Sequence, residues 1–432
     1  MIRGNCGITS VIGLWFVVCF AAMASADVSP GDVIDQTNWE KAQGLLPESV
    51  LNWVKQGDFT LDIDNLNFSV MDKMPQFVQE APKTNGGKLA LDGDGAIVDV
   101  GSGKPPQYIL GTPFPDLDVA DPKVAEKIIH NNKYAQYMIG SGYIDAEGFW
   151  LGRSGYERKV GYEARQIVMD GHPGVVTLTN KKRIEKYMLL VMRSPFDISG
   201  TSVLLWRFLD PTKQDLNFGY LPAVRRARRM NPANRSDSFL GTDFAVDDTN
   251  GYDGKIPAFT WKLLGRKAAI VPWVEPDPAR IVQNQAGEWE TRSNNVVYGY
   301  QKEGWQGAPW APTNVVWVKR EVYVIEAKAK DGYYNYGTQH MWIDTETFNC
   351  SYKMINDRAG KYWKTLLLPD WVCESGDNKA RFKLVGVSIV MIDERTDHAT
   401  ATESGSANNK MVFGANLDEV DFTLAGFQKY CK

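Results

Sequence analysis

Histidine and cysteine are scarce in this chain of 432 residues, and their scarcity limits the chemistry that the chain can support. There are only four histidines, and no two of them lie closer than 42 positions. No histidine or cysteine spacing is typical of a zinc or iron–sulfur site. We therefore expect no metal centre and no cofactor.

The chain also lacks an excess of charge of one sign. Lys and Arg total 48 against 52 Asp and Glu, a formal net charge of −4. This balance argues against a nucleic-acid partner, and 44% apolar residues indicate a globular protein. Aromatic residues are plentiful, with 14 Trp, 18 Tyr and 18 Phe. Such side chains line cores and pockets, so the composition favours binding over metal chemistry.

Long apolar runs are missing except at the N-terminus. Val11–Met23 is apolar, Arg3 is the only charge before it, and Ala24–Ala26 resembles a signal-peptidase site. Residues 1–26 are therefore predicted to be a signal peptide that is removed. The run is too short for a membrane span, and Cys19 lacks the small preceding residues of a lipoprotein signal. We expect a soluble exported protein.

Removal of that segment leaves three cysteines, Cys350, Cys373 and Cys431. In an oxidising compartment they allow at most one internal disulfide, and we expect one near the C-terminus without deciding which two pair. A catalytic thiol is disfavoured because none of the three has a histidine nearby in the sequence.

Residues 27–150 read as helices and a glycine-rich wrap. Helices are expected over Asn38–Leu46 and Pro47–Val54, and a third is expected to begin with Asp121 as N-cap and Pro122 at its first position. Lys83–Pro115 is rich in Gly and Pro, which favours an extended cover over the surface.

Residues 151–432 alternate with period two. Leu204, Trp206 and Phe208 share one face of a strand with Arg207 on the other, and Leu216–Tyr220 alternates in the same way. We predict a mainly β (α+β) protein, in which one large curled antiparallel sheet has its concave face covered by the helices and loops of residues 27–150. A curled sheet with such a lid encloses an apolar cleft.

Several stretches carry a family resemblance. Ser194–Gly200, Tyr220–Arg229 and Arg235–Phe244 resemble the outer-membrane lipoprotein-sorting-like proteins, relatives of LolA and LolB, and Trp342–Leu366 resembles the recurring hairpin of that superfamily. The N-terminal part is more specifically similar to the proteobacterial domain-of-unknown-function family thirteen twenty-nine, through Gly31–Ile34, Leu45–Val50, Gly111–Pro115 and Asp121-Pro122.

The resemblance implies a half-barrel with a helical lid and a periplasmic carrier of a lipid or other hydrophobic molecule. It also implies an envelope transport partner, either an exporter of the resistance–nodulation–division type or an outer-membrane protein. The alternative is a periplasmic interaction protein that docks on such a partner without a ligand of its own. Fold alone does not decide between them.

A basic run is the densest charge feature of the chain. It consists of Arg225, Arg226, Arg228 and Arg229. At a cavity mouth these residues could bind head groups or a partner, since guanidinium groups bind phosphate and carboxylate bidentately. We favour the simpler interpretation, in which they pair with the acidic residues that follow: Asp237, Asp243, Asp247 and Asp248.

Aromatic residues on the predicted strands are the candidates for the ligand wall, with Trp206 and Phe218 foremost. The full set is Trp206, Phe208, Phe218, Tyr220, Trp261, Trp342, Tyr352 and Trp363. No catalytic residue is predicted, because Gly152–Gly155, Gly101–Lys104 and Asp92–Gly95 each lack the context of the motif they resemble. An enzyme, which would be a hydrolase, is therefore disfavoured.

Overall fold

The structure is a computed structural model that describes Met1 and residues 27–230, 235–291, 296–377, 379–384, 388–403 and 410–431; the side chains of residues 383 and 384 are not described. The predicted signal peptide falls on residues outside these ranges, apart from Met1. None of the helices in the described part is long and apolar enough to cross a membrane.

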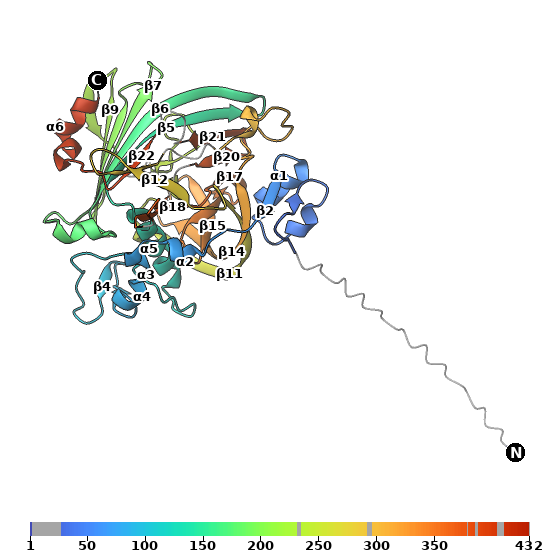
Figure 1. Cartoon of the computed structure of the whole chain (residues 1–432), viewed down its shortest axis with the longest axis horizontal. Coiled ribbons are helices and arrows are strands. Elements are labelled where there is room, and N and C mark those ends of the chain that lie inside the picture. Colours follow the sequence, from blue (N-terminus) through green and yellow to red (C-terminus); the bar gives the residue numbers. More distant parts are fainter. Residues whose placement is uncertain are drawn as a thin grey trace.

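A curled, mostly antiparallel sheet of 20 strands dominates the described part of the chain (Figure 1). Its main run places antiparallel neighbours in the order β10 (Arg226–Arg229), β9 (Leu216–Leu221), β8 (Ser202–Phe208), β7 (Ile184–Ser194), β6 (Gly155–Val168), β5 (Gly142–Gly152), β21 (His398–Glu403), β20 (Val390–Asp393), β17 (Tyr362–Leu367), β16 (Cys350–Asp357), β15 (Tyr336–Asp344), β14 (Val316–Ala329) and β11 (Phe259–Trp273). The predicted fold class is confirmed.

The sheet branches at two long strands. The first residues of β5 pair with β22 (Met411–Phe413). From β22 a second run of paired strands continues through β13 (Trp289–Thr291), β12 (Ala279–Gln283), β18 (Trp371–Ser375) and β19 (Arg381–Leu384). A single bridge between Trp273 and Asp370 links this run back to the end of β11. At β14 the branch consists of β2 (Leu61–Asp64) and β1 (Val33–Ile34). The pairs β12–β18 and β14–β2 are parallel.

Short helices and one hairpin make up most of the N-terminal part. In chain order they are η1 (Trp39–Ala42), α1 (Glu48–Gln56), α2 (Val70–Lys73), α3 (Gln76–Gln79), α4 (Ala81–Thr84), β3 (Leu89–Leu91), β4 (Ile97–Asp99) and α5 (Val124–Tyr137). Figure 1 shows α2, α3, α4 and β4 gathered beside α5, while α1 lies apart from them next to β2. The large sheet takes strands from this part as well, since β1, β2 and β5 begin before residue 151.

The start of α5 differs from the sequence prediction. Its N-cap is Lys123, two residues after the predicted Asp121. The Asp121 carboxylate instead accepts a hydrogen bond from the backbone N–H of Lys123 at 2.8 Å, while the carbonyl of Asp121 accepts from the N–H of Val124. Asp121 therefore closes a turn that precedes the helix.

The remaining helices are short and lie between or after the strands. They are η2 (Pro173–Thr177), η4 (Val246–Asp248), η5 (Ile256–Ala258), η6 (Gly299–Gln301), η7 (Glu419–Phe422), α6 (Leu424–Phe427) and η8 (Gln428–Tyr430).

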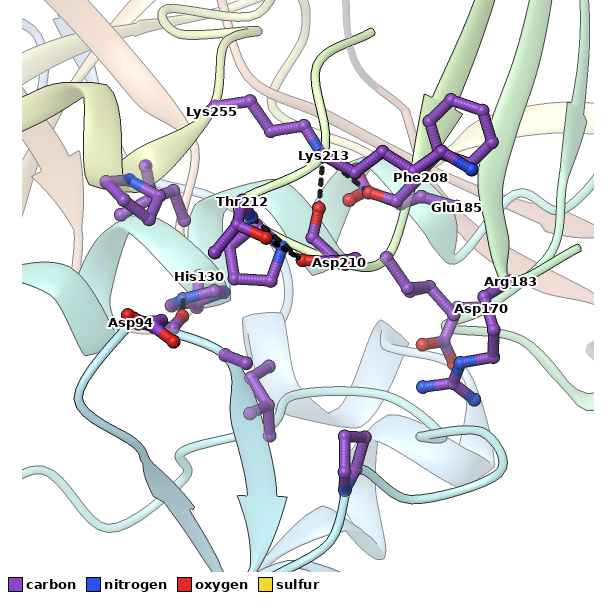
Figure 2. Close-up of a pocket in the computed structure, with 18 of the residues that line it drawn as sticks. Asp94, His130, Asp170, Arg183, Glu185, Phe208, Asp210, Thr212, Lys213 and Lys255 are labelled. Atoms are coloured by element: carbon purple, nitrogen blue, oxygen red, sulfur yellow. Dashed lines mark hydrogen bonds between the residues drawn. The ribbon is translucent and has the colours of Figure 1, made fainter.

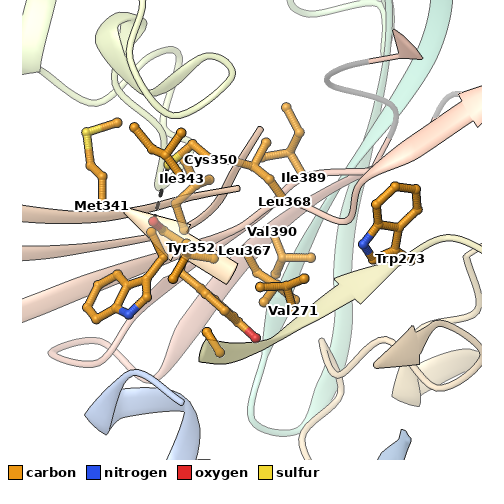
Figure 3. Close-up of a cluster of buried hydrophobic side chains, with 14 of the residues drawn as sticks. Val271, Trp273, Met341, Ile343, Cys350, Tyr352, Leu367, Leu368, Ile389 and Val390 are labelled. Atoms are coloured by element: carbon orange, nitrogen blue, oxygen red, sulfur yellow. Dashed lines mark hydrogen bonds between the residues drawn. The ribbon is translucent and has the colours of Figure 1, made fainter. Parts of the chain in front are cut away.

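The main core lies between β11 and the β15–β20 part of the sheet (Figure 3). Val271, Met341, Leu367 and Val390 are buried there, and the Tyr352 hydroxyl donates to the carbonyl of Ile270 at 2.6 Å. A second apolar cluster on β7 and β8 is closed by the C-terminal helices.

The expected disulfide is not formed. Cys350, Cys373 and Cys431 are free and buried. Cys350 and Cys373 lie on different strands of the main core, whereas Cys431 belongs to the second cluster. The three thiols are packed as small apolar groups.

Candidate functional site

The interior of the curl is occupied by residues 235–258, which precede β11 and which we call the plug segment. It contacts strands that lie far apart in the sheet: Asp253 meets Lys186 on β7, and Asp248 meets Lys353 on β16. Since several strands separate β7 from β16, one segment can reach both only from inside the curl. The concave face is therefore covered partly by the plug segment and not only by residues 27–150.

Buried ion pairs hold the plug segment in place. The Lys353 ammonium lies 2.8 Å from an Asp248 oxygen, and both side chains are fully buried. Asp248 also accepts hydrogen bonds from the Tyr336 hydroxyl at 2.8 Å and from the backbone N–H of Ala245 at 2.7 Å. Because isolated buried charges are costly, this pairing fixes the position of the segment.

A second group of buried charges surrounds Arg207. Its guanidinium is fully buried and binds the carboxylates of Asp215 and Asp253, and Asp253 also binds Lys186 at 2.9 Å. Burial opposes ionisation of Asp253, but Arg207 and Lys186 outweigh it and hold the pKa of Asp253 below its usual value. The sequence alternation predicted Arg207 on the face of β8 that does not carry Trp206 and Phe208. The structure shows that this second face is buried as well.

A cavity of about 620 Å³ lies where β7 begins and β8 ends (Figure 2). Its wall comes from α5, from the loop around β3 and β4, and from residues 208–213 and 255–257. The volume is within the range of small-molecule sites. A neighbouring cavity of about 270 Å³ shares Arg183 with it.

Apolar and charged side chains share the cavity wall. Ile97, Ile109, Phe208 and Ile256 provide apolar surface. The charged and ionisable side chains, most of which are labelled in Figure 2, are Asp92, Asp94, His130, Lys133, Asp170, Lys182, Arg183, Glu185, Asp210, Lys213 and Lys255. This mixture is more polar than the apolar cleft that the sequence predicted.

Most carboxylates of the wall are held by donors of the protein itself. Asp92 accepts from the backbone N–H groups of Asp94 and Ala96, and Asp210 accepts from Thr212. Lys133 lies 2.8 Å from Glu185. Such carboxylates have fewer free acceptor sites for a ligand.

Burial shifts the pKa values of several groups in the wall. It raises the pKa of Asp170 to about 6, although the Tyr134 hydroxyl donates to that carboxylate at 2.7 Å. Burial, with a smaller effect from Lys133, lowers the pKa of His130 to about 3. Burial also lowers the pKa of Lys255 to about 8. At neutral pH His130 is therefore uncharged and Lys255 remains largely protonated.

Three cations of the wall make no ion pair within the described residues: Lys182, Arg183 and Lys213. The Lys213 ammonium lies 3.4 Å from the centre of the Phe208 ring, and Arg183 donates to the carbonyl of Pro106 at 3.2 Å. These cations are available to an anionic group of a ligand.

The structure does not bring the eight candidate aromatic residues together in one wall. Phe208 alone among them borders the large cavity. Trp261, Trp342 and Tyr352 belong to the main core, and Trp363 packs against it and donates to Asp393 at 2.8 Å.

The other three, Trp206, Phe218 and Tyr220, lie beneath the C-terminal segment of residues 419–430. The indole N–H of Trp206 donates to the carbonyl of Phe422 at 2.7 Å, and the Tyr220 ring packs edge-on against Phe427. Figure 1 shows α6 of this segment beside β9. The chain itself therefore partly covers these aromatic residues.

The basic run forms β10 and the turn before it. Arg225, Arg226, Arg228 and Arg229 are all exposed, and none makes an ion pair within the described residues. The pairing that we favoured is therefore wrong. The four acidic residues bind elsewhere: Asp237 binds Asn335, Asp243 binds His398, Asp247 binds Arg235 and Asp248 binds Lys353.

These arginines do not lie at the cavity mouth either. β10 pairs with β9 at the end of the sheet where β7 finishes, and the cavity lies where β7 begins. Through β9 and β8, Arg229 lies in register with Leu189 of β7, four residues from Glu185 of the cavity wall, so at about 3.3 Å per residue the arginines begin roughly 13 Å along the strands from the cavity.

Residues 33–427 match the model of the family described as "Protein of unknown function (DUF1329)". The chain belongs to the DUF1329 family. No curated protein matches it.

Three solved structures are similar to this DUF1329 protein. A putative outer-membrane lipoprotein-sorting protein domain from Vibrio parahaemolyticus has 16% identity and a TM-score of 0.46, over 70% of this chain and 97% of its own. A DUF1329 protein from Desulfovibrio piger has 13% identity and a TM-score of 0.46, with the same coverage. LolA superfamily protein NE2245 from Nitrosomonas europaea has 12% identity and a TM-score of 0.41, over 70% and 98%.

Proposed function

We propose that this DUF1329 protein is a periplasmic binding protein that carries an amphiphilic anion in the cavity at the start of β7. The observation that carries the proposal is the composition of the cavity wall, where apolar side chains lie beside cations that make no ion pair in the described chain. The sequence prediction of a hydrophobic ligand is thereby narrowed to a ligand with both an apolar part and a negative group.

Two physical contributions would hold such a ligand. Each methylene buried against Ile97, Ile109 and Phe208 contributes about 0.8 kcal/mol. Lys182 and Lys213, both exposed at the cavity edge, supply ion pairs that are each worth about 0.2–1 kcal/mol. Neither contribution requires a chemical step, and we propose a carrier without catalytic activity.

The periplasmic location rests on the predicted signal peptide at residues 1–26. The transport partner rests on the family resemblance, and we propose an exporter of the resistance–nodulation–division type or an outer-membrane protein. Nucleic acid is not proposed as a partner, because the net charge is −4.

A second candidate function is an interaction protein without a ligand of its own. It is favoured by the covering of both faces of the sheet, since the plug segment occupies the interior and residues 419–430 lie on the opposite, aromatic face of β8. The two candidates differ in whether the 620 Å³ cavity binds a molecule.

Anilinonaphthalene sulfonate tests the proposal, because it joins apolar rings to one sulfonate and becomes fluorescent in an apolar site. We expect saturable one-to-one binding. Lys182→Gln combined with Lys213→Gln should weaken it several-fold, the loss expected from two exposed ion pairs. Lys262→Gln with Lys319→Gln removes two exposed charges from β11 and β14 and is the matched control.

A third variant, Ile97→Trp, fills part of the cavity and should also weaken binding. Equal affinity in the wild type, the cavity variants and the control would contradict the carrier and favour the interaction protein.

A further inference from the structure

Two turns lie side by side at the end of the sheet opposite the cavity. One joins β7 to β8 and the other joins β9 to β10; we call residues 195–201 and 222–225 the tip turns. Ser202 pairs with Tyr220 at their base. Gly200 has a φ of +81° and approaches the second turn so closely that a Cβ there would lie 3.3 Å from Pro222. Figure 1 shows β7 and β9 ending together near the C-terminus, at the edge of the molecule.

Apolar side chains project from this end into solvent. Phe196 is 98% exposed, Leu221 is 52% exposed and Val224 is 46% exposed. A fully exposed phenylalanine is unfavourable in water, and burial of its ring elsewhere would release that cost.

Positive charge accompanies the apolar side chains. The four arginines of β10 and its turn, residues 225, 226, 228 and 229, are exposed and have no carboxylate partner in the described residues. Asp197, the acidic residue of the tip turns, is engaged with Arg158 at 2.8 Å. The end of the sheet therefore has an excess of positive charge.

Protection of a sheet edge explains only part of this pattern. Among the described strands β10 is paired with β9 alone, and charged residues on an edge strand discourage pairing with other chains. That requirement does not explain the exposed Phe196 on the neighbouring turn, which is not part of the edge strand.

We propose that the tip turns dock this protein on the surface of an anionic lipid bilayer. Arginine guanidinium groups would bind lipid phosphates, and Phe196, Leu221 and Val224 would enter the boundary between head groups and acyl chains. A stable protein interface buries about 800 Å² on each partner, more than three apolar side chains on two turns supply. A bilayer requires only a few inserted side chains and a basic cluster.

This docking does not depend on the carrier function. The cavity lies roughly 35 Å away along β7, so a docked molecule would keep its cavity clear of the bilayer surface. Loss of vesicle binding and loss of ligand binding are therefore separate results.

Co-sedimentation of residues 27–432 with vesicles tests the proposal. We expect binding to vesicles of equal parts phosphatidylglycerol and phosphatidylcholine, weaker binding in 300 mM salt, and little binding to phosphatidylcholine alone. Replacing the four arginines by Gln should reduce binding about a hundredfold or more, since each basic residue near an anionic surface contributes about fivefold. Phe196→Ser alone should reduce binding several-fold.

The matched control replaces Lys262, Lys319, Lys328 and Lys330 by Gln. All four are exposed, they lie on or next to β11 and β14, and the change in net charge is the same. Equal losses in the control and in the arginine variant would overturn the proposal, because net charge would then explain the binding. If the protein bound no vesicle but was retained on immobilised polyglutamate, the bilayer proposal would be overturned and an acidic protein partner would be favoured.

Discussion

Asp248→Asn tests whether buried charge holds the plug segment inside the sheet. The substitution keeps the side-chain volume but leaves the Lys353 ammonium, which is fully buried, without its carboxylate at 2.8 Å. Breaking a buried ion pair on one side costs about 3–5 kcal/mol. We expect a decrease of that size in the free energy of unfolding.

Guanidinium unfolding followed by tryptophan fluorescence and circular dichroism measures this loss. Adding Lys353→Met removes the orphaned charge, so the double variant should be at least about 2 kcal/mol more stable than the sum of the two single losses. Glu321→Gln is the control, because its pair with Arg266 is about half exposed, at 49% and 55%. That pair is worth about 1 kcal/mol or less. An Asp248→Asn loss no larger than that of the control would refute the reasoning.

The other predictions concern titration, the C-terminal segment and the thiols. Hydrogen bonding to Asp243 raises the pKa of His398. The stability lost in His398→Gln should therefore be largest below pH 6.5 and should vanish as the pH rises through the raised pKa of His398. An equal loss in melting temperature at every pH would contradict this prediction. Phe427→Ala should cost about 3–5 kcal/mol and speed proteolysis within residues 419–430, whereas unchanged cleavage would mean that the segment is not docked. Burial raises the pKa of Asp170 to about 6, so anilinonaphthalene sulfonate should bind more tightly below pH 6 in the wild type but not in Asp170→Asn. The three buried cysteines should react with a thiol reagent only after unfolding, and labelling of the native protein would contradict their burial.

Strands could be predicted from the sequence because their signals are local. Period-two alternation predicted β8 and β9, and the hairpin resemblance of Trp342–Leu366 falls on β15, β16 and β17. Branching of the sheet at β5 and β14 could not be predicted. Each of these long strands pairs with two different strands along the same edge, and no local sequence signal marks where one partner ends and the next begins.

The cavity and the plug segment were not predictable, because their partners are distant in sequence. Lys353 and Asp248 are 105 residues apart, and Lys186 and Asp253 are 67 apart. One signal was available: Lys186, Arg207 and Lys353 are charged residues with apolar or aromatic neighbours inside strands. A charge inside such a strand indicates that an opposite charge is buried against it.

Native mass spectrometry of the protein purified from its own periplasm, with lipid analysis of whatever dissociates, tests the central claim most directly. We expect one bound amphiphile that carries a carboxylate, phosphate or sulfonate group, and a lower bound fraction in a Lys182→Gln, Lys213→Gln variant purified in the same way. A mass equal to that of the bare chain from Asp27 to Lys432, with no uptake of added anionic amphiphiles, would contradict the carrier.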